Sequence, residues 1–375
     1  DYTFNIQGDD SFIENGDADN LLDSDNLWNP ISDSGSFLVF GDQFNPIDAY
    51  EGEQTIGATY VSAEFNLSEK LKTVVGLRTE FFKSYYTGEN NVTKFDEQII
   101  LDEFDLFPSA NVIYSVTDNS NLRTSYSRTT ARPSFKESSV ARIFDPITNR
   151  LFIGNINLVP TYINNFDLRY ERFGENGQMV AISSFYKDFK DPIEQAFFLQ
   201  APTQLTVDNL GNAKVFGVEF EIRQRLGFLS EGLNNLKFNV NASLIKSQLT
   251  MSDAEFDSRT LAARDGEKIE RKRDLQGQAP FLINFGLDYN NSELGLQTGL
   301  FFNVQGETLE VVGVGLVPDV YTKSFESLNF TLNKSFGEMK QSNINFKVSN
   351  ILSSRRESAY QSYKAQDQTF SVRLP

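Results

Sequence analysis

The charged residues with the most regular spacing in this sequence lie in two short segments. They stand at every second position, and the six are Asp167, Arg169, Glu171, Glu219, Glu221 and Arg223. Side chains at alternate positions share one face of a β-strand, so this spacing predicts two strands with a charged face. Such side chains can pair with one another, line a water-filled space or contact another domain.

Most residue types that perform acid–base, redox or metal chemistry are missing. The 375 residues include no Cys and no His, with 34 Lys plus Arg against 51 Asp plus Glu. This composition excludes disulfides, Cys/His zinc sites and His-dependent nucleophiles. Carboxylate pairs stay possible, but no motif places two of them in a cleft. We therefore predict no catalytic residue, no cofactor and no enzyme activity.

An acidic segment near the N-terminus has oxygen ligands of the kind that calcium binds, including Asp17, Asp19, Asp23 and Asp25. Its spacing lacks the glycine and terminal glutamate of an EF-hand loop, so we interpret it as a solvated loop and predict no metal site. The formal net charge of −17 argues against nucleic acid as a partner, because phosphates require cations.

Alternation of apolar and polar residues is the main structural signal. It predicts twelve strands of about ten residues, at 56–65, 71–82, 106–116, 121–128, 165–171, 179–187, 216–225, 236–244, 281–289, 294–304, 324–333 and 343–349. Strands of about 9–11 residues suit a tilted crossing of a bilayer. The sequence contains no apolar run long enough for a transmembrane helix.

The links between these strands alternate between short and long. An antiparallel up-and-down transmembrane β-barrel has this asymmetry, with short turns at one rim and long loops at the other. Residues 2–7 and 370–374 resemble two further strands, which raises the expected total to about fourteen. Residues 8–50 are expected to form a long acidic extracellular loop. A soluble sandwich would also alternate, but its strands are usually shorter.

Several segments resemble the C-terminal barrel region of TonB-dependent outer-membrane receptors, in particular the group with a carboxypeptidase-regulatory-like N-terminal domain. The resemblance extends from about Gly57 to the end of the chain. It rests on the order of the segments 77–80 (LRTE), 107–111 (FPSAN), 125–128 (SYSR), 132–135 (RPSF), 154–158 (GNINL), 164–171 (NNFDLRYE), 185–187 (FYK), 192–194 (PIE), 216–221 (FGVEFE), 275–280 (LQGQAP) and 350–352 (NIL).

This resemblance implies a 22-strand barrel closed by an N-terminal plug domain. Residues 1–375 would be the C-terminal part of that barrel, with the plug, the TonB-contacting segment and the signal peptide outside this chain. Barrel glutamates hold the plug in such receptors, and Glu219 and Glu221 are the candidates here. The motif residues Arg132, Pro133 and Phe135 are expected at a strand exit, with ligand contact as the alternative.

The function implied by the resemblance is uptake of a bulky nutrient, such as a siderophore, cobalamin, a glycan or a peptide. The expected location is the outer membrane of a Gram-negative bacterium. Expected partners are the plug, TonB, outer-membrane lipid, the ligand and, as a further possible partner, a surface lipoprotein. Two alternatives are a non-transport barrel acting as adhesin or scaffold, and a soluble β-rich carbohydrate-binding protein.

Overall fold

The computed structural model describes residues 4–7, 37–40, 46–146, 149–198, 201, 203–263, 268–337, 341–361 and 370–373. Its main feature is one large antiparallel sheet. The twelve long strands of this sheet are β3 (Tyr50–Ser68), β4 (Leu71–Glu89), β5 (Lys94–Thr117), β6 (Ser120–Ala131), β9 (Thr161–Phe173), β10 (Met179–Lys190), β13 (Asn212–Arg225), β14 (Leu236–Thr250), β16 (Phe281–Asn291), β17 (Leu296–Gln305), β20 (Phe325–Phe336) and β21 (Ser342–Val348).

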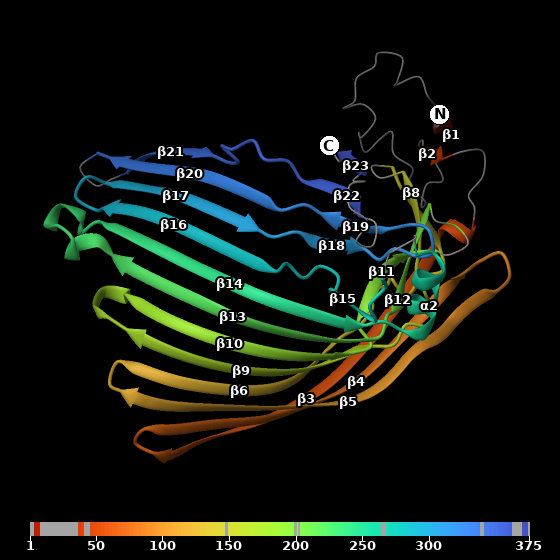
Figure 1. Cartoon of the computed structure of the whole chain (residues 1–375), viewed down its shortest axis with the longest axis horizontal. Coiled ribbons are helices and arrows are strands. Elements are labelled where there is room, and N and C mark those ends of the chain that lie inside the picture. The colour runs from red at the N-terminus through yellow and green to blue at the C-terminus, as the bar shows by residue number, and fades with distance from the viewer. Residues whose placement is uncertain are drawn as a thin grey trace, which may run out of the picture.

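These strands follow one another in chain order from β3 to β21, and the two-residue strand β15 (Lys272–Arg273) pairs with β14. Figure 1 shows that they form a curved sheet, with the short turns at one end and most short elements at the other. All twelve predicted strands are present. Their up-and-down order is the order that the alternation of short turns with long links predicted.

Several strands are longer than predicted. β5 has 24 residues and pairs with β4 as far as Glu89 and Lys94. Much of the segment 83–105, which the predicted strands 71–82 and 106–116 left as a link, is therefore an extension of these two strands. The predicted strands end too early because the alternation of apolar and polar residues stops where the strands no longer need an apolar outer surface. Backbone pairing between β4 and β5 continues beyond that point.

The two end segments pair differently from the prediction. β1 (Phe4–Gln7) pairs with β2 (Phe37–Phe40), and β23 (Phe370–Arg373) pairs with β22 (Glu357–Gln361). Neither joins the large sheet, which has twelve long strands instead of fourteen. Four alternating residues specify a strand but not its partner. The acidic ligand candidates at 15–25 and most of the loop 8–50 lie outside the described residues.

The remaining strands and the α-helix lie in the long links, whereas three of the 3-10 turns lie in the short ones. The strands are β7 (Arg142–Asp145), β8 (Arg150–Ile153), β11 (Ile193–Phe197), β12 (Gln204–Asn209), β18 (Thr308–Val311) and β19 (Asp319–Thr322). The helices are α2 (Asp253–Leu261) and the 3-10 turns η2 (Pro46–Asp48), η3 (Glu175–Gly177), η4 (Leu226–Phe228) and η5 (Glu231–Leu233). Within the described residues, no helix has the length and apolar character to cross a membrane.

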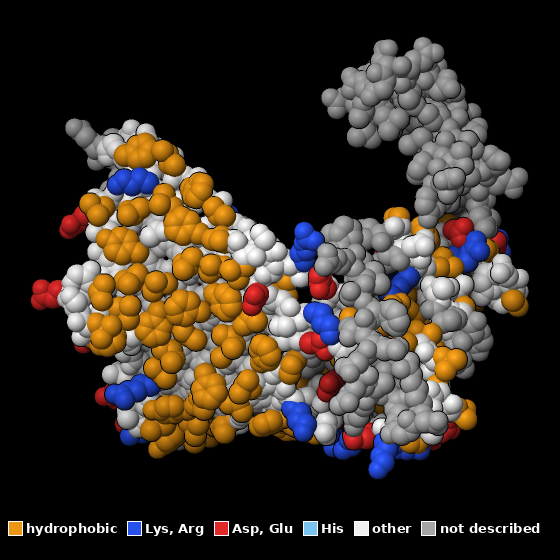
Figure 2. Space-filling view, turned by 45° about the horizontal axis from the view of Figure 1, so that its top comes forward, with side chains coloured by type: hydrophobic (Ala, Val, Ile, Leu, Met, Phe, Trp, Pro, Cys, Tyr) orange, Lys and Arg blue, Asp and Glu red, His pale blue; other side chains and the backbone are white. Residues whose placement is uncertain are grey.

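The two faces of the large sheet differ in chemistry. One face exposes apolar side chains, including Phe166, Leu168, Phe220, Ile182 and Phe346, which are 44–55% exposed. Figure 2 shows a broad hydrophobic surface of this kind over the sheet. The opposite face, called the inner face below, carries the charged residues and the amides. An apolar outer face that stays exposed is what lipid contact requires.

Candidate functional site

Four of the six charged residues predicted on alternating strands lie in one chain of ion pairs on the inner face. Arg169 on β9 contacts Glu171 at 3.0 Å and Glu221 on β13 at 2.9 Å. Arg223 contacts the other oxygen of Glu221 at 2.7 Å, and Arg123 on β6 contacts Glu171 at 2.6 Å. Arg123 was not predicted. We call these five residues the wall ion chain.

The strand register explains this assembly. Ser183 on β10 is opposite both Arg169 on β9 and Glu219 on β13, while Ala181 is opposite Glu171 and Glu221. The small side chains on β10 leave room for the guanidinium of Arg169 to reach across to β13. The side chain of Glu171 is 6% exposed, so its charge depends on the two arginines that contact it.

The other two predicted carboxylates are left without a cation. Asp167 accepts a hydrogen bond from Ser125 at 3.3 Å, and Glu219 accepts one from Ser243 at 3.3 Å. Neither has an ion-pair partner in the part of the chain that the structure describes. The inner face thus offers two carboxylates for an external cation, whereas Glu221 is already paired with two arginines.

Arg132, directly after β6, anchors a segment that folds inward. Its guanidinium contacts Glu80 at 2.9 Å and Asp105 at 3.0 Å, and lies 4.4 Å from the ring centre of Phe82. Tyr162 also donates a hydrogen bond to Asp105 at 2.6 Å. Arg132 is therefore paired with two carboxylates of the wall and carries little uncompensated charge, although its buried Nε has no hydrogen-bond partner.

The next residues of this motif lie over the same wall. Pro133 is buried, and Phe135 is 37% exposed. Further along, the hydroxyl of Tyr86 on β4 accepts a hydrogen bond from the backbone N–H of Val140 at 3.2 Å. The segment 132–140 is therefore fixed against the inner face at both ends.

The long links on one rim pack together, and we call residues 132–160, 191–211, 251–280, 306–324 and 349–361 within the described chain the loop layer. Two four-stranded sheets, β11-β12-β8-β7 and β18-β19-β22-β23, form its framework, and only the edge strand β23 comes from outside these residues. A bridge between Ala196 and Val312 joins them. The long loops are thus folded, although the strand pattern in the sequence predicted only links there.

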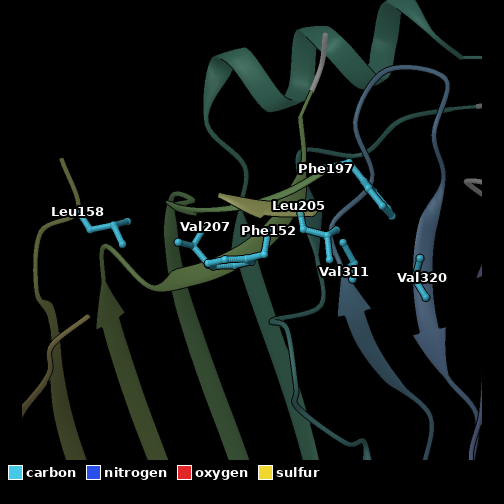
Figure 3. Packing of buried hydrophobic residues seen from close by; sticks show 7 residues of the cluster. All are labelled: Phe152, Leu158, Phe197, Leu205, Val207, Val311 and Val320. Atoms are coloured by element: carbon cyan, nitrogen blue, oxygen red, sulfur yellow. The ribbon is translucent and has the colours of Figure 1, made fainter. Parts of the chain in front are cut away.

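An apolar cluster holds the loop layer together. It contains Phe152, Leu158, Phe197, Leu205, Val207, Val311 and Val320, all at most 8% exposed. Figure 3 shows these side chains, which come from three different links, with Leu158 on a coil segment to one side of the others. Burial of side chains this large contributes roughly 1.5–3 kcal/mol each, so the cluster stabilises the layer without a ligand.

A buried network of five charged residues also links three of the loops, and sequence reasoning missed it. Arg273 on β15 contacts Glu194 on β11 at 2.6 Å and Glu255 on α2 at 2.6 Å. Arg259 on α2 contacts Glu255 at 2.9 Å and Asp319 on β19 at 2.9 Å. All five side chains are 1–7% exposed. We call this set the loop ion network.

The opposite charges in the loop ion network stabilise one another. Burial disfavours the charge on Arg273, but the hydrogen bonds and charges of Glu194 and Glu255 outweigh it and raise the pKa of this guanidinium above its ordinary value. Burial also raises the pKa of the neighbouring Asp274. The sequence signal near this network is the dense mixture of charges at 264–273, a pattern that by itself predicts a mobile surface loop, with partner or ligand contact as the alternative. Its described part, 268–273, instead ends in a buried arginine.

Metal binding is not indicated by the geometry. Among the described residues, no group of three or more carboxylates is arranged so that it could hold a metal ion. The carboxylates of both charged clusters point at guanidiniums, which neutralise them. What the two clusters can do is shape a polar lumen and fix the loops above it.

A curved up-and-down sheet with an apolar outer face, a charged inner face and one folded rim is the wall of a membrane β-barrel. The family model for the TonB-dependent receptor-like β-barrel matches residues 1–351. The chain therefore belongs to the TonB-dependent receptor β-barrel family. Members of this family reside in the outer membrane of Gram-negative bacteria and are transporters and receptors with an N-terminal plug, working with TonB.

Solved structures agree with this fold. The siderophore receptor PiuA from Acinetobacter baumannii has a TM-score of 0.60 at 12% identity, with 87% of this chain and 42% of that chain covered. The ferric yersiniabactin uptake receptor FyuA from Yersinia pestis has a TM-score of 0.55 at 17% identity, over 87% and 44%. The copper transporter OprC has a TM-score of 0.59 at 13% identity, over 93% and 50%.

This chain spans half the length of these structures or less. At these identities the likeness shows the fold and not the ligand. No curated protein sequence gives a significant match.

Proposed function

We propose that this chain is part of a TonB-dependent outer-membrane transporter that takes up a bulky nutrient through a plugged barrel. The observation that carries this proposal is the placement of a folded loop layer at one rim of a charged, curved wall. Loops at a barrel rim are suited to capture a solute, and a hydrated polar wall is suited to let it pass. A purely adhesive surface would not require the hydrated polar wall.

The proposed location is the outer membrane of a Gram-negative bacterium, with lipid against the apolar face. The proposed partners are an N-terminal plug in the lumen, TonB acting through that N-terminal region, and a surface lipoprotein at the rim. The proposed ligands are siderophores, cobalamin, glycans or peptides.

Plug contact is proposed for the carboxylates that lack a cation. Asp167 and Glu219 fit this role better than Glu221, because Arg169 and Arg223 already neutralise Glu221. A hydrated ion pair between wall and plug contributes about 0–1 kcal/mol. Contacts of this size hold a plug collectively and still yield when it is pulled.

The test uses the full-length receptor in its own cells. We expect it in the outer-membrane fraction, with faster gel migration before boiling than after, as a closed barrel shows. We also expect growth on one limiting nutrient to require both this receptor and its TonB-contacting segment. A receptor that migrates identically with and without boiling, or growth that is unaffected by loss of that segment, would refute the proposal.

A further inference from the structure

The apolar outer face of the large sheet ends, on the side of the loop layer, at three exposed lysines. Lys190, Lys214 and Lys246 lie on the adjacent strands β10, β13 and β14. Their chain neighbours show which way they point, because side chains alternate between the two faces of a strand. Ala213 and Val215, on either side of Lys214, are 0% and 1% exposed and pack beneath the loop layer. Lys214 therefore points away from the lumen.

The strand register places the three lysines next to one another on this outer face. Lys190 is opposite Asn212, which is two positions from Lys214. Lys214 is opposite Gln248, which is two positions from Lys246. Diagonal neighbours of this kind on one face of a sheet lie about 7–8 Å apart. A group with several oxygen atoms can therefore reach two of the three ammonium groups at once.

Apolar side chains begin at the next outward positions toward the short turns. Phe216 follows Lys214 on the outer face, lies opposite Lys246 and is 53% exposed. Leu244, two residues before Lys246, is 59% exposed, and Phe166 on β9 is 46% exposed. Charge and apolar surface thus meet within one outward position. In a membrane barrel, this border marks the depth at which the hydrocarbon ends and the lipid headgroups begin.

The charge at this border is opposite in sign to that of the whole chain, whose formal net charge is −17. Beyond the apolar surface, the outward positions of β6, β9, β10, β13, β14 and β15 hold five cations and one carboxylate, which we call the cationic border: Arg128, Lys190, Lys214, Lys246, Lys272 and Asp188. Asp188 is opposite Lys214, and Lys246 interacts electrostatically with Asp274. None of the five cations forms an ion pair within the described chain, so a surplus of positive charge faces the membrane surface.

We propose that the cationic border binds the phosphate headgroup of a membrane lipid, in the leaflet on the side of the loop layer, with the acyl chains along Phe216 and Leu244. The inference rests on the proposed function only in that it requires the barrel to lie in a membrane. A phosphate monoester has three acceptor oxygens and about two negative charges, which suits two neighbouring lysines. A lipid covers both parts of this surface at once, whereas a free phosphate would leave the apolar side chains uncovered.

Native mass spectrometry of the full-length receptor with its plug, in detergent, measures this binding. The probes are dioleoyl phosphatidic acid and dioleoylglycerol, which share their acyl chains and differ in the phosphate. We expect phosphatidic acid to bind at least about tenfold more tightly. One lysine near a membrane surface strengthens the attraction of anionic lipid about fivefold, so the triple variant Lys190→Gln, Lys214→Gln and Lys246→Gln should bind phosphatidic acid about a hundredfold more weakly. Arginine at the same three positions keeps the charge and should stay within about threefold of the unmodified receptor.

Lys83→Gln is the matched control, because Lys83 also lies on the outer face but already contacts Asp102 at 3.0 Å. It should change the binding of phosphatidic acid by no more than about twofold, and heat-modifiable migration of each variant checks folding. Equal binding of the two lipids, or equal binding of phosphatidic acid by the unmodified receptor and the triple glutamine variant, would overturn the site. Displacement of the lipid by inorganic phosphate at the same concentration would overturn a lipid as the occupant. Lipid selectivity without any TonB-dependent uptake would overturn the proposed function and leave the site intact.

Discussion

Arg273→Met is the substitution that best tests the loop ion network. Arg273 makes two hydrogen bonds to Glu194, at 3.1 and 2.6 Å, and two to Glu255, at 2.6 and 3.2 Å. Methionine fills a similar volume but leaves Glu194, at 1% exposure, with no cation in the described chain. The change therefore removes charge compensation with little loss of packing.

The magnitude follows from burial. Breaking a buried ion pair by removing one partner costs about 3–5 kcal/mol, because the remaining charge stays desolvated. At about 1.4 kcal/mol per tenfold, the local opening equilibrium of the loop layer should shift by roughly a hundredfold to several thousandfold. The large sheet should be unaffected, because Arg273 pairs with β14 only at its last residues.

Hydrogen exchange of the full-length receptor in detergent reports this shift directly. We expect faster exchange throughout 191–211, 251–263 and 306–324, because the network joins all three loops, and unchanged exchange in β13 and β16. The raised pKa of Arg273 keeps its guanidinium charged from pH 5 to pH 8, so in the unmodified protein this group should add no pH dependence to the exchange of the loop layer.

Arg271→Met provides the matched control. Arg271 contacts Asp253 at 2.6 Å in the same segment, but the two side chains are 53% and 84% exposed. Such a pair contributes about 0–1 kcal/mol, so exchange should change by no more than about fivefold. Equal effects of the two substitutions, or an Arg273→Met effect confined to 268–280, would refute the reasoning that the buried network couples the loops.

Three further outcomes follow from the structure. Burial raises the pKa of Asp274 in the folded protein above its value in the unfolded chain. The charged carboxylate therefore destabilises the loop layer at pH values above the folded pKa, and this destabilisation disappears as the pH falls. Asp274→Asn should slow hydrogen exchange of the loop layer at pH 8 and have no effect near pH 3. Phe220→Arg on the apolar face should destabilise the folded barrel in lipid by about 2–4 kcal/mol in reversible urea unfolding, whereas Asn241→Arg on the inner face should not. Glu219→Gln should loosen the plug and raise sensitivity to a large antibiotic such as vancomycin, whereas Glu175→Gln in the turn after β9 should not; unchanged sensitivity would argue against plug contact.

The sequence by itself determined the strands and their faces. Alternation is a local property, because side chains two residues apart share a face whatever lies beside the strand. The twelve long strands, their antiparallel order and the inward position of Arg169 and Glu221 could therefore be predicted. The links could be separated into short and long for the same reason, since each is bounded by two recognisable strands.

Only the tertiary structure decided which charges meet. Arg169 reaches Glu221 rather than Glu219 because of the register across β10, which no single strand encodes. Arg273 and Glu194 are 79 residues apart in the chain, and the strands that bring them together have two and five residues. Segments this short have no measurable period. Their pairing depends on burial of the surrounding loops, which is a property of the folded layer and not of any one segment.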